Sequence, residues 1–205
     1  MIKLIEKHCR WLQIQNLPLI LSVGYILFFL LVISNTVTKD SIDLYGKAVW
    51  ENGEYWRLFS FVLFISVDPL FIFFTVLLQW TFGTALEQTY GSIRFTLFFF
   101  TALLSAIAAS YILPNARFED SFSICVFLSF ALIFPEYTIL LFFIIPIKIK
   151  WLALLTWIII FFQIIQTKGS SESIADALVI IIPIALFFGK EVYYKIKYKT
   201  RKTIV

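Results

Sequence analysis

Long apolar runs separated by short polar links dominate the chain. Two of these runs, Leu19–Ile33 and Leu152–Ile165, continue without a regular alternation of apolar and polar residues. A membrane β-barrel would alternate, whereas an apolar run approaching ~20 residues predicts a helix that spans the bilayer. The pattern therefore predicts six spanning helices, at Pro18–Thr36, Pro69–Leu86, Phe95–Leu113, Phe122–Phe134, Trp151–Gln166 and Ile174–Phe188.

The links between these helices differ in length and composition. Val37–Arg57 is polar and rich in Tyr and Trp, which prefer the bilayer interface, so we expect it at the membrane surface and partly helical. Phe61–Ile65 is expected to lead into the second helix as a re-entrant or interfacial piece. Ile139–Ile145 is apolar but too short to span, which predicts an interfacial or half-buried connector.

Three segments follow from this pattern. Residues 1–15 carry basic residues on one helical face, which predicts an interfacial amphipathic segment. Residues 16–189 form the predicted six-helix membrane domain. Residues 190–205 form a basic tail, which we interpret as a cytoplasmic anchor on anionic lipid and not as a nucleic-acid-binding segment.

Composition supports lipid as the solvent of this chain. Hydrophobic residues make up 60% of the 205 residues and charged residues 15%, against roughly 45–50% and about 25% in soluble domains. The surplus apolar surface excludes an ordinary soluble fold. The two cysteines, Cys9 and Cys125, show no metal-ligand spacing, so we expect no disulfide, no metal site and no cofactor.

The basic residues are distributed unevenly over the links. If the N-terminus lies inside, most of the 17 basic residues fall in inside segments. The positive-inside rule then places both termini in the cytoplasm, and an even number of helices is consistent with this. We expect an integral membrane protein of the plasma membrane.

Three short stretches resemble the rhomboid superfamily. Gly53–Leu58 reads Gly-Glu-Tyr-Trp-Arg-Leu, Gly83–Glu87 and Tyr90–Phe95 surround a predicted turn, and Phe134-Pro135 follows the fourth helix. The resemblance implies an all-α polytopic membrane protein, a six-helix rhomboid-like bundle with cytoplasmic N- and C-termini. It implies structural roles for the following residues: Glu54, Trp56, Arg57, Gly83, Glu87, Gly91 and Arg94.

The resemblance to an active protease fails at the catalytic positions. Active rhomboids need a serine in a Gly-x-Ser-Gly turn at the start of the fourth helix and a histidine on the sixth. The single histidine here, His8, precedes the first helix, and the serine-turn region Phe118–Ser123 contains no glycine. The second helix, at Asp68–Phe74, lacks the His and Asn that help to hold the oxyanion in active members. These departures predict a pseudoprotease.

Three functions compete on this basis. The first is a catalytically inactive rhomboid-like protein that binds or regulates other membrane proteins, with membrane lipids and transmembrane clients as partners. The second is an atypical rhomboid intramembrane serine protease that uses Ser121, Ser123 or Ser129 with Asp176 or Lys168. The third is a small transporter, which apolar helix centres and the lack of an internal repeat disfavour.

The binding hypothesis places a client helix between the second and fifth helices. The side chains expected to line this gap are Phe71, Phe74, Trp157 and Phe161. Asp176 is either a contact for a polar group of the client or an exposed first-turn residue, and the favoured interpretation is the exposed residue.

Overall fold

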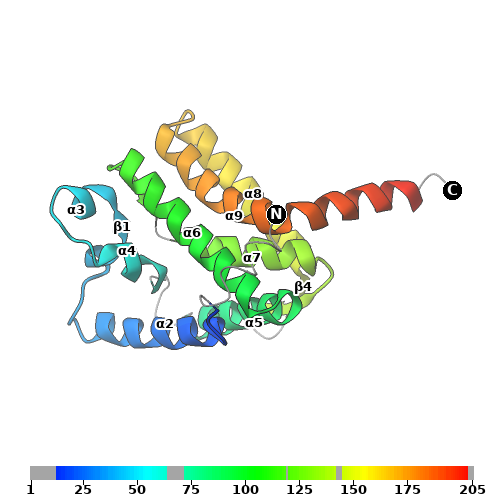
Figure 1. Ribbon diagram of the computed structural model, residues 1–205, viewed down its shortest axis with the longest axis horizontal. Helices are drawn as coiled ribbons and strands as arrows, with labels where there is room; N and C mark the ends of the chain where they lie inside the picture. Colours follow the sequence, from blue (N-terminus) through cyan, green and yellow to red (C-terminus); the bar gives the residue numbers. More distant parts are fainter. Residues whose placement is uncertain (1–12, 64–71, 119, 142–144, 203–205) are drawn as a thin grey trace.

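The computed structural model describes residues 13–63, 72–118, 120–141 and 145–202 (Figure 1). The predicted interfacial segment therefore falls almost entirely outside the described residues, as do His8 and Phe71. The start of the second predicted helix also lies outside them.

A helix lies at each of the six predicted places. These helices are α2 (Leu17–Ile33), α5 (Ile72–Tyr90), α6 (Ser92–Ile112), α7 (Ser121–Ile133), α8 (Ile149–Gln166) and α9 (Ser171–Lys202). Among the described residues, α6, α8 and the Ser171–Gly189 part of α9 are long and apolar enough to cross a membrane, while α2 and α7 are shorter apolar helices. The prediction of an all-α polytopic membrane protein is confirmed.

The sixth helix is longer at both ends than predicted. It begins at Ser171, not Ile174, and it runs beyond Phe188 and Gly189 to Lys202, so the predicted end is wrong. A single glycine costs a helix only about 1 kcal/mol, and the residues after it are mostly strong helix formers. Beyond Gly189 the helix projects away from the rest of the molecule (Figure 1).

The connector after α7 is a β-hairpin and not an irregular segment. Strand β3 (Thr138–Leu141) pairs antiparallel with β4 (Ile145–Lys148), with Thr138 opposite Lys148. Pairing satisfies backbone N–H and C=O groups that lipid cannot satisfy, which explains why an apolar run too short for a spanning helix folds this way.

The long surface segment after α2 is partly helical, as expected. It contains η2 (Lys39–Ser41), α3 (Gly46–Trp50), α4 (Arg57–Ser60) and η3 (Phe61–Leu63). Strand β1 (Leu44–Tyr45) pairs antiparallel with β2 (Arg117–Phe118), which lies in the link before α7. This pairing fixes the surface segment to the start of α7.

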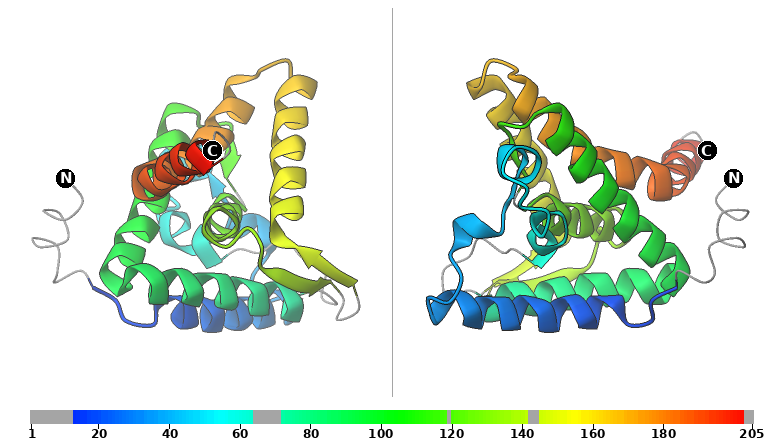
Figure 2. Two further views of the ribbon diagram at one scale, coloured as in Figure 1. Left: turned by 90° about the vertical axis from the view of Figure 1, so that its right-hand side faces the viewer. Right: turned by 60° about the vertical axis from the view of Figure 1, so that its left-hand side comes forward.

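Helix α7 lies at the centre of the helix packing. It packs against α5, α8 and α9, while α6 packs along α9 and α2 crosses α5 at one side of the molecule (Figure 2). Phe130 and Leu128 of α7 are almost fully buried, as are Phe98 of α6 and Leu86 of α5. Helix α8 buries only Ile149 and Ile160, so most of its apolar surface faces outward.

Candidate functional site

The site region expected from the sequence lies where α7 begins and faces α9. The Ser121 hydroxyl donates a hydrogen bond to Oδ1 of Asp176 across 2.7 Å. Ser121 is buried, and Asp176 lies in the second turn of α9 because the helix already begins at Ser171. The favoured interpretation of Asp176 as an exposed first-turn residue is therefore wrong.

The other two candidate serines have different surroundings. Ser123 accepts a hydrogen bond from Nε2 of Gln79, a largely buried residue of α5. Ser129 lies one helical turn after Cys125 and is fully buried. The three serines therefore do not share one site, and only Ser121 faces a carboxylate.

A second cluster of charges holds the surface segment in place. Arg57, only 7% exposed, donates to Oδ1 of Asp43 at 2.6 Å, to Oε2 of Glu54 at 2.6 Å and to the carbonyl of Asp40 at 2.7 Å. Trp56 is exposed, and its Nε1 donates to the carbonyl of Ser41 at 3.1 Å. Arg57 thus binds protein carbonyls and carboxylates, while Trp56 remains free to act as an interface anchor.

Arg117 extends this cluster to the link before α7. Its guanidinium donates to Oδ2 of Asp43 at 2.6 Å and lies 4.9 Å from the ring centroid of Tyr45. Asp43 is 1% exposed, and its carboxylate accepts hydrogen bonds from both Arg57 and Arg117. Burial raises the pKa of the Asp43 carboxyl, and the charges of Arg117 and Arg57 oppose that rise. Arg117 stands four residues before Ser121, so the cluster positions the segment that leads to it.

The residues around the α5–α6 turn have separate roles. Gly91 adopts a φ of 87° between the two helices, a conformation that favours glycine. Gly83 lies inside α5 and not beside the turn, and a Cβ there would lie 2.9 Å from Cβ of Pro18. Buried Glu87 accepts a hydrogen bond from the backbone N–H of Asn16 at 3.0 Å, and Arg94 lies 5.4 Å from the Tyr90 ring centroid.

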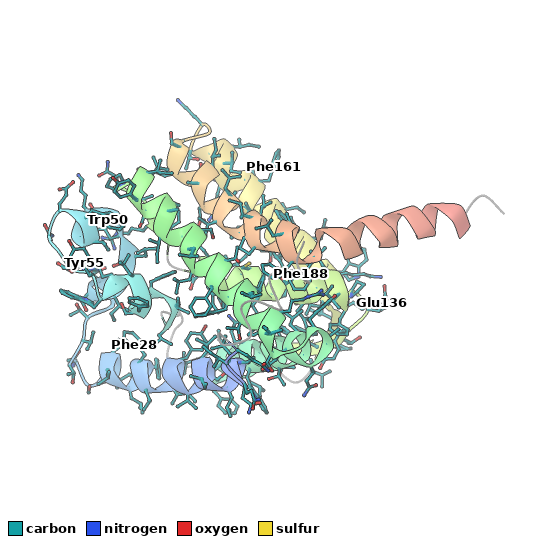
Figure 3. All side chains as sticks on the ribbon, viewed as in Figure 1. Phe28, Trp50, Tyr55, Glu136, Phe161 and Phe188 are labelled. Atoms are coloured by element: carbon teal, nitrogen blue, oxygen red, sulfur yellow. The ribbon has the colours of Figure 1, made fainter. Side chains whose placement is uncertain are left out.

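The expected client surface lies on two helices that flank α7. Phe74 is half-buried on α5, while Trp157 is 36% and Phe161 63% exposed on α8 (Figure 3). Helix α8 makes its helix contacts mainly with α7 and α9, and α5 packs on α7 from another side. Phe71 lies outside the described residues.

Comparison with known proteins decides the family. The family model described as Rhomboid domain matches residues 52–177, more than half of the chain. This chain belongs to the rhomboid family. The matched range includes Ser121, Asp176 and both arginines of the charge cluster, while Asp43 of that cluster lies before it.

One curated rhomboid protein gives a second comparison. The chain is 34% identical over 99 residues to the rhomboid protease GluP of Bacillus subtilis (strain 168), a stretch that covers 46% of this chain. It spans only 19% of the length of GluP. No solved structure matches the chain.

Sequence reasoning missed several polar residues that connect distant segments. Asp43, Arg117 and Gln79 carry polar side chains in a mostly apolar chain. Because such residues are rare here, each of them could have been singled out from the sequence as a candidate for a buried contact. The Arg117–Asp43 and Gln79–Ser123 contacts join residues more than 40 positions apart, so no local sequence pattern predicts them. Within the described residues, no group of three His, Cys, Asp or Glu side chains could hold a metal ion.

Proposed function

We propose that this chain is a catalytically inactive rhomboid-family protein of the plasma membrane, with both termini in the cytoplasm. It binds transmembrane segments of other membrane proteins and does not cut them. The observation that carries this proposal is the Ser121–Asp176 hydrogen bond at the start of α7. The buried serine there faces a carboxylate and not an imidazole.

Acid–base chemistry explains why this pair is a poor catalyst. A serine hydroxyl attacks a peptide bond only when a base takes its proton, and efficient bases have a pKa near the working pH. An ordinary aspartate has a pKa of about 3.9, against about 6.5 for histidine. The Ser121–Asp176 hydrogen bond holds α7 against α9, and it pairs the serine with a carboxylate in place of the histidine of active rhomboids.

The client surface is supported by exposed aromatic side chains. Phe161 and Trp157 are partly exposed on α8, a helix that buries only two of its residues. Phe74 lies on α5, which packs against α7 as α8 does. Aromatic side chains give a large contact area for an apolar helix. We propose that a client helix binds across α7 between α5 and α8.

Site-specific photo-crosslinking in native membranes tests this surface. A photoreactive phenylalanine replaces Phe74 or Phe161, and the matched control carries it at Leu104 of α6, which is 61% exposed against 63% for Phe161. The proposal expects the same few membrane proteins to be captured at Phe74 and Phe161 and to be absent at Leu104. Capture of lipid alone at all three positions would contradict it.

The same hydrogen bond favours one second candidate, an atypical serine protease with Ser121 as nucleophile and Asp176 as base. A fluorophosphonate probe, which labels activated serines, distinguishes the two functions. Labelling of the wild type that is lost in Ser121→Ala would support the protease. If the protein is inactive, the probe should label neither the wild type nor Ser121→Ala.

A further inference from the structure

An open groove of about 300 Å³ lies between α7 and α8. Leu128 and Leu132 of α7 line one side, while Ala153 and Trp157 of α8 line the other. Lys150, at the start of α8, also lines the groove and is the charged residue of its lining. The groove is therefore apolar along its length and cationic at one end.

A second lysine stands beside this cationic end. Nζ of Lys148 lies 2.8 Å from Oε2 of Glu136, and Nζ of Lys150 lies 2.5 Å from Oε1 of the same carboxylate. The two lysine side chains are 50% and 38% exposed. An ammonium group has three N–H donors, so each lysine keeps donors free after binding Glu136. Two positive charges against one negative charge leave this cluster cationic.

The surroundings of the cluster are those of a membrane interface. Trp151 is 59% exposed, and Nζ of Lys150 lies 5.9 Å from its ring centroid, while Tyr137, which follows Glu136 in the chain, is 45% exposed. Tyr, Trp and Lys gather where the apolar core of the bilayer meets the headgroups. The cationic end of the groove is thus expected at headgroup level, with the apolar part within the hydrocarbon core.

We propose that this groove is a binding site for an anionic phospholipid. One acyl chain lies along Leu132, Ala153 and Trp157, and the headgroup phosphate accepts hydrogen bonds from Lys148 and Lys150. A ligand that is apolar along its length and anionic at one end matches both features of the groove. The lipid site shares Trp157 with the proposed client surface and uses neither Phe74 nor Phe161.

The size of the groove favours a lipid over a protein helix. A helix with its side chains is about 10–12 Å across, whereas an acyl chain has the thickness of one apolar side chain. The α7–α8 groove has a volume of about 300 Å³, and the small side chain of Ala153 forms part of its lining. An apolar helix would also leave the two lysines without an anionic partner.

Photolabelling in nanodiscs tests the site directly. The full chain is reconstituted in phosphatidylcholine that contains a trace of phosphatidylglycerol with a diazirine in one acyl chain, and labelled peptides are mapped by mass spectrometry. A phosphatidylcholine probe with the same acyl diazirine is the comparison. The proposal expects the anionic probe to label α7 and the first half of α8 in preference to the neutral probe.

Two variants and two matched controls separate the headgroup from the acyl chain. Lys148→Gln with Lys150→Gln should reduce labelling by the anionic probe, by about fivefold for each lysine. Ala153→Trp should abolish it by filling the groove. Lys168→Gln removes a lysine at the other end of α8, and Ile159→Trp adds the same bulk on the opposite side of α8, so both should label like the wild type.

Three results would overturn the lipid site. The first is equal labelling by the anionic and neutral probes, and the second is labelling that survives Ala153→Trp. The third is the capture of another protein, and not of lipid, by a photoreactive phenylalanine placed at Leu132 in native membranes.

Discussion

Arg57 shows how a charged residue is accommodated in a chain with so few charges. It is buried, and its guanidinium nitrogens meet two carboxylates and two backbone carbonyls. Arginine suits this position because its planar fork offers several donors in fixed directions. Asp43 joins Arg57 to Arg117, so one buried carboxylate connects the surface segment to the link that precedes Ser121.

Arg57→Ala should therefore destabilise the protein strongly. Removal of one partner from a buried ion pair leaves the other charge uncompensated, at a typical cost of about 3–5 kcal/mol. Thermal unfolding in detergent micelles measures the effect, with exposed Lys168→Ala as the control that should leave the midpoint unchanged. A midpoint for Arg57→Ala equal to that of Lys168→Ala would show that the cluster contributes nothing.

Glu136 predicts a pH dependence of the stability of the hairpin region. Hydrogen bonds from Lys148 and Lys150 lower the pKa of Glu136 from 4.5 to about 2. Because the folded pKa is lowered, the stabilisation is complete above pH 4.5 and is lost as the pH falls towards 2. The difference in unfolding midpoint between the wild type and Glu136→Gln should be small, since Glu136 is exposed, and should vanish over that range. A difference that stays constant from pH 7 to pH 2 would contradict this assignment.

At the scale of elements, α7 is the helix that connects the others. It contacts α5 through Ser123 and Gln79, and it contacts α9 through Ser121 and Asp176. Side-chain hydrogen bonds of this kind join helices in lipid, where water cannot compete for the polar groups. The Ser121–Asp176 pair therefore links α7 to α9.

Ser121→Ala should cost more stability than Asp176→Asn. The alanine leaves a half-buried carboxylate without its donor, a loss of about 1–3 kcal/mol for an unsatisfied polar group. Asparagine keeps an oxygen that accepts from Ser121 and removes the charge. Unfolding midpoints of the two variants measured side by side test this order. The reverse order would mean that the charge of Asp176, and not the hydrogen bond, holds α9 in place.

Two glycines in helices should respond to alanine in opposite directions. At Gly83 a Cβ would lie 2.9 Å from Cβ of Pro18, so Gly83→Ala pushes α2 away from α5. At Gly189 a Cβ would meet no atom within 4 Å, so Gly189→Ala gains the helix propensity of alanine, about 1 kcal/mol. Gly83→Ala should lower the unfolding midpoint and Gly189→Ala should raise it. Equal shifts would show that Pro18 and α2 yield without cost.

The sequence predicts the helices better than the contacts between them. Apolar runs such as Leu152–Ile165 mark a helix by length alone, and the family motifs point to Arg57 and the α5–α6 turn. The sequence does not reveal that Asp43 receives two arginines or that Asp176 binds Ser121, because both depend on packing between distant segments. The pairing of β3 with β4 is missed for a related reason, since apolar runs of this length do not distinguish strand from connector.

At the scale of the whole molecule, the rhomboid domain places the buried Ser121 of α7 against the carboxylate of Asp176 on α9. Helix α8 stands at the edge with most of its apolar surface outward, and α7 lies between it and α5 (Figure 2). This arrangement leaves apolar surface on α8, where the proposed lipid and client sites lie.

The length of a client captured at Phe161 tests the central claim most directly. The photoreactive residue is placed at Phe161 in two proteins, one with Ser121 intact and one with Ser121→Ala. Both are crosslinked in membranes, and mass spectrometry gives the length of the client that each captures. The account predicts full-length client in both samples and no fragment in the surrounding membrane. Client fragments that are present with the wild type and absent with Ser121→Ala would contradict it and establish an active protease.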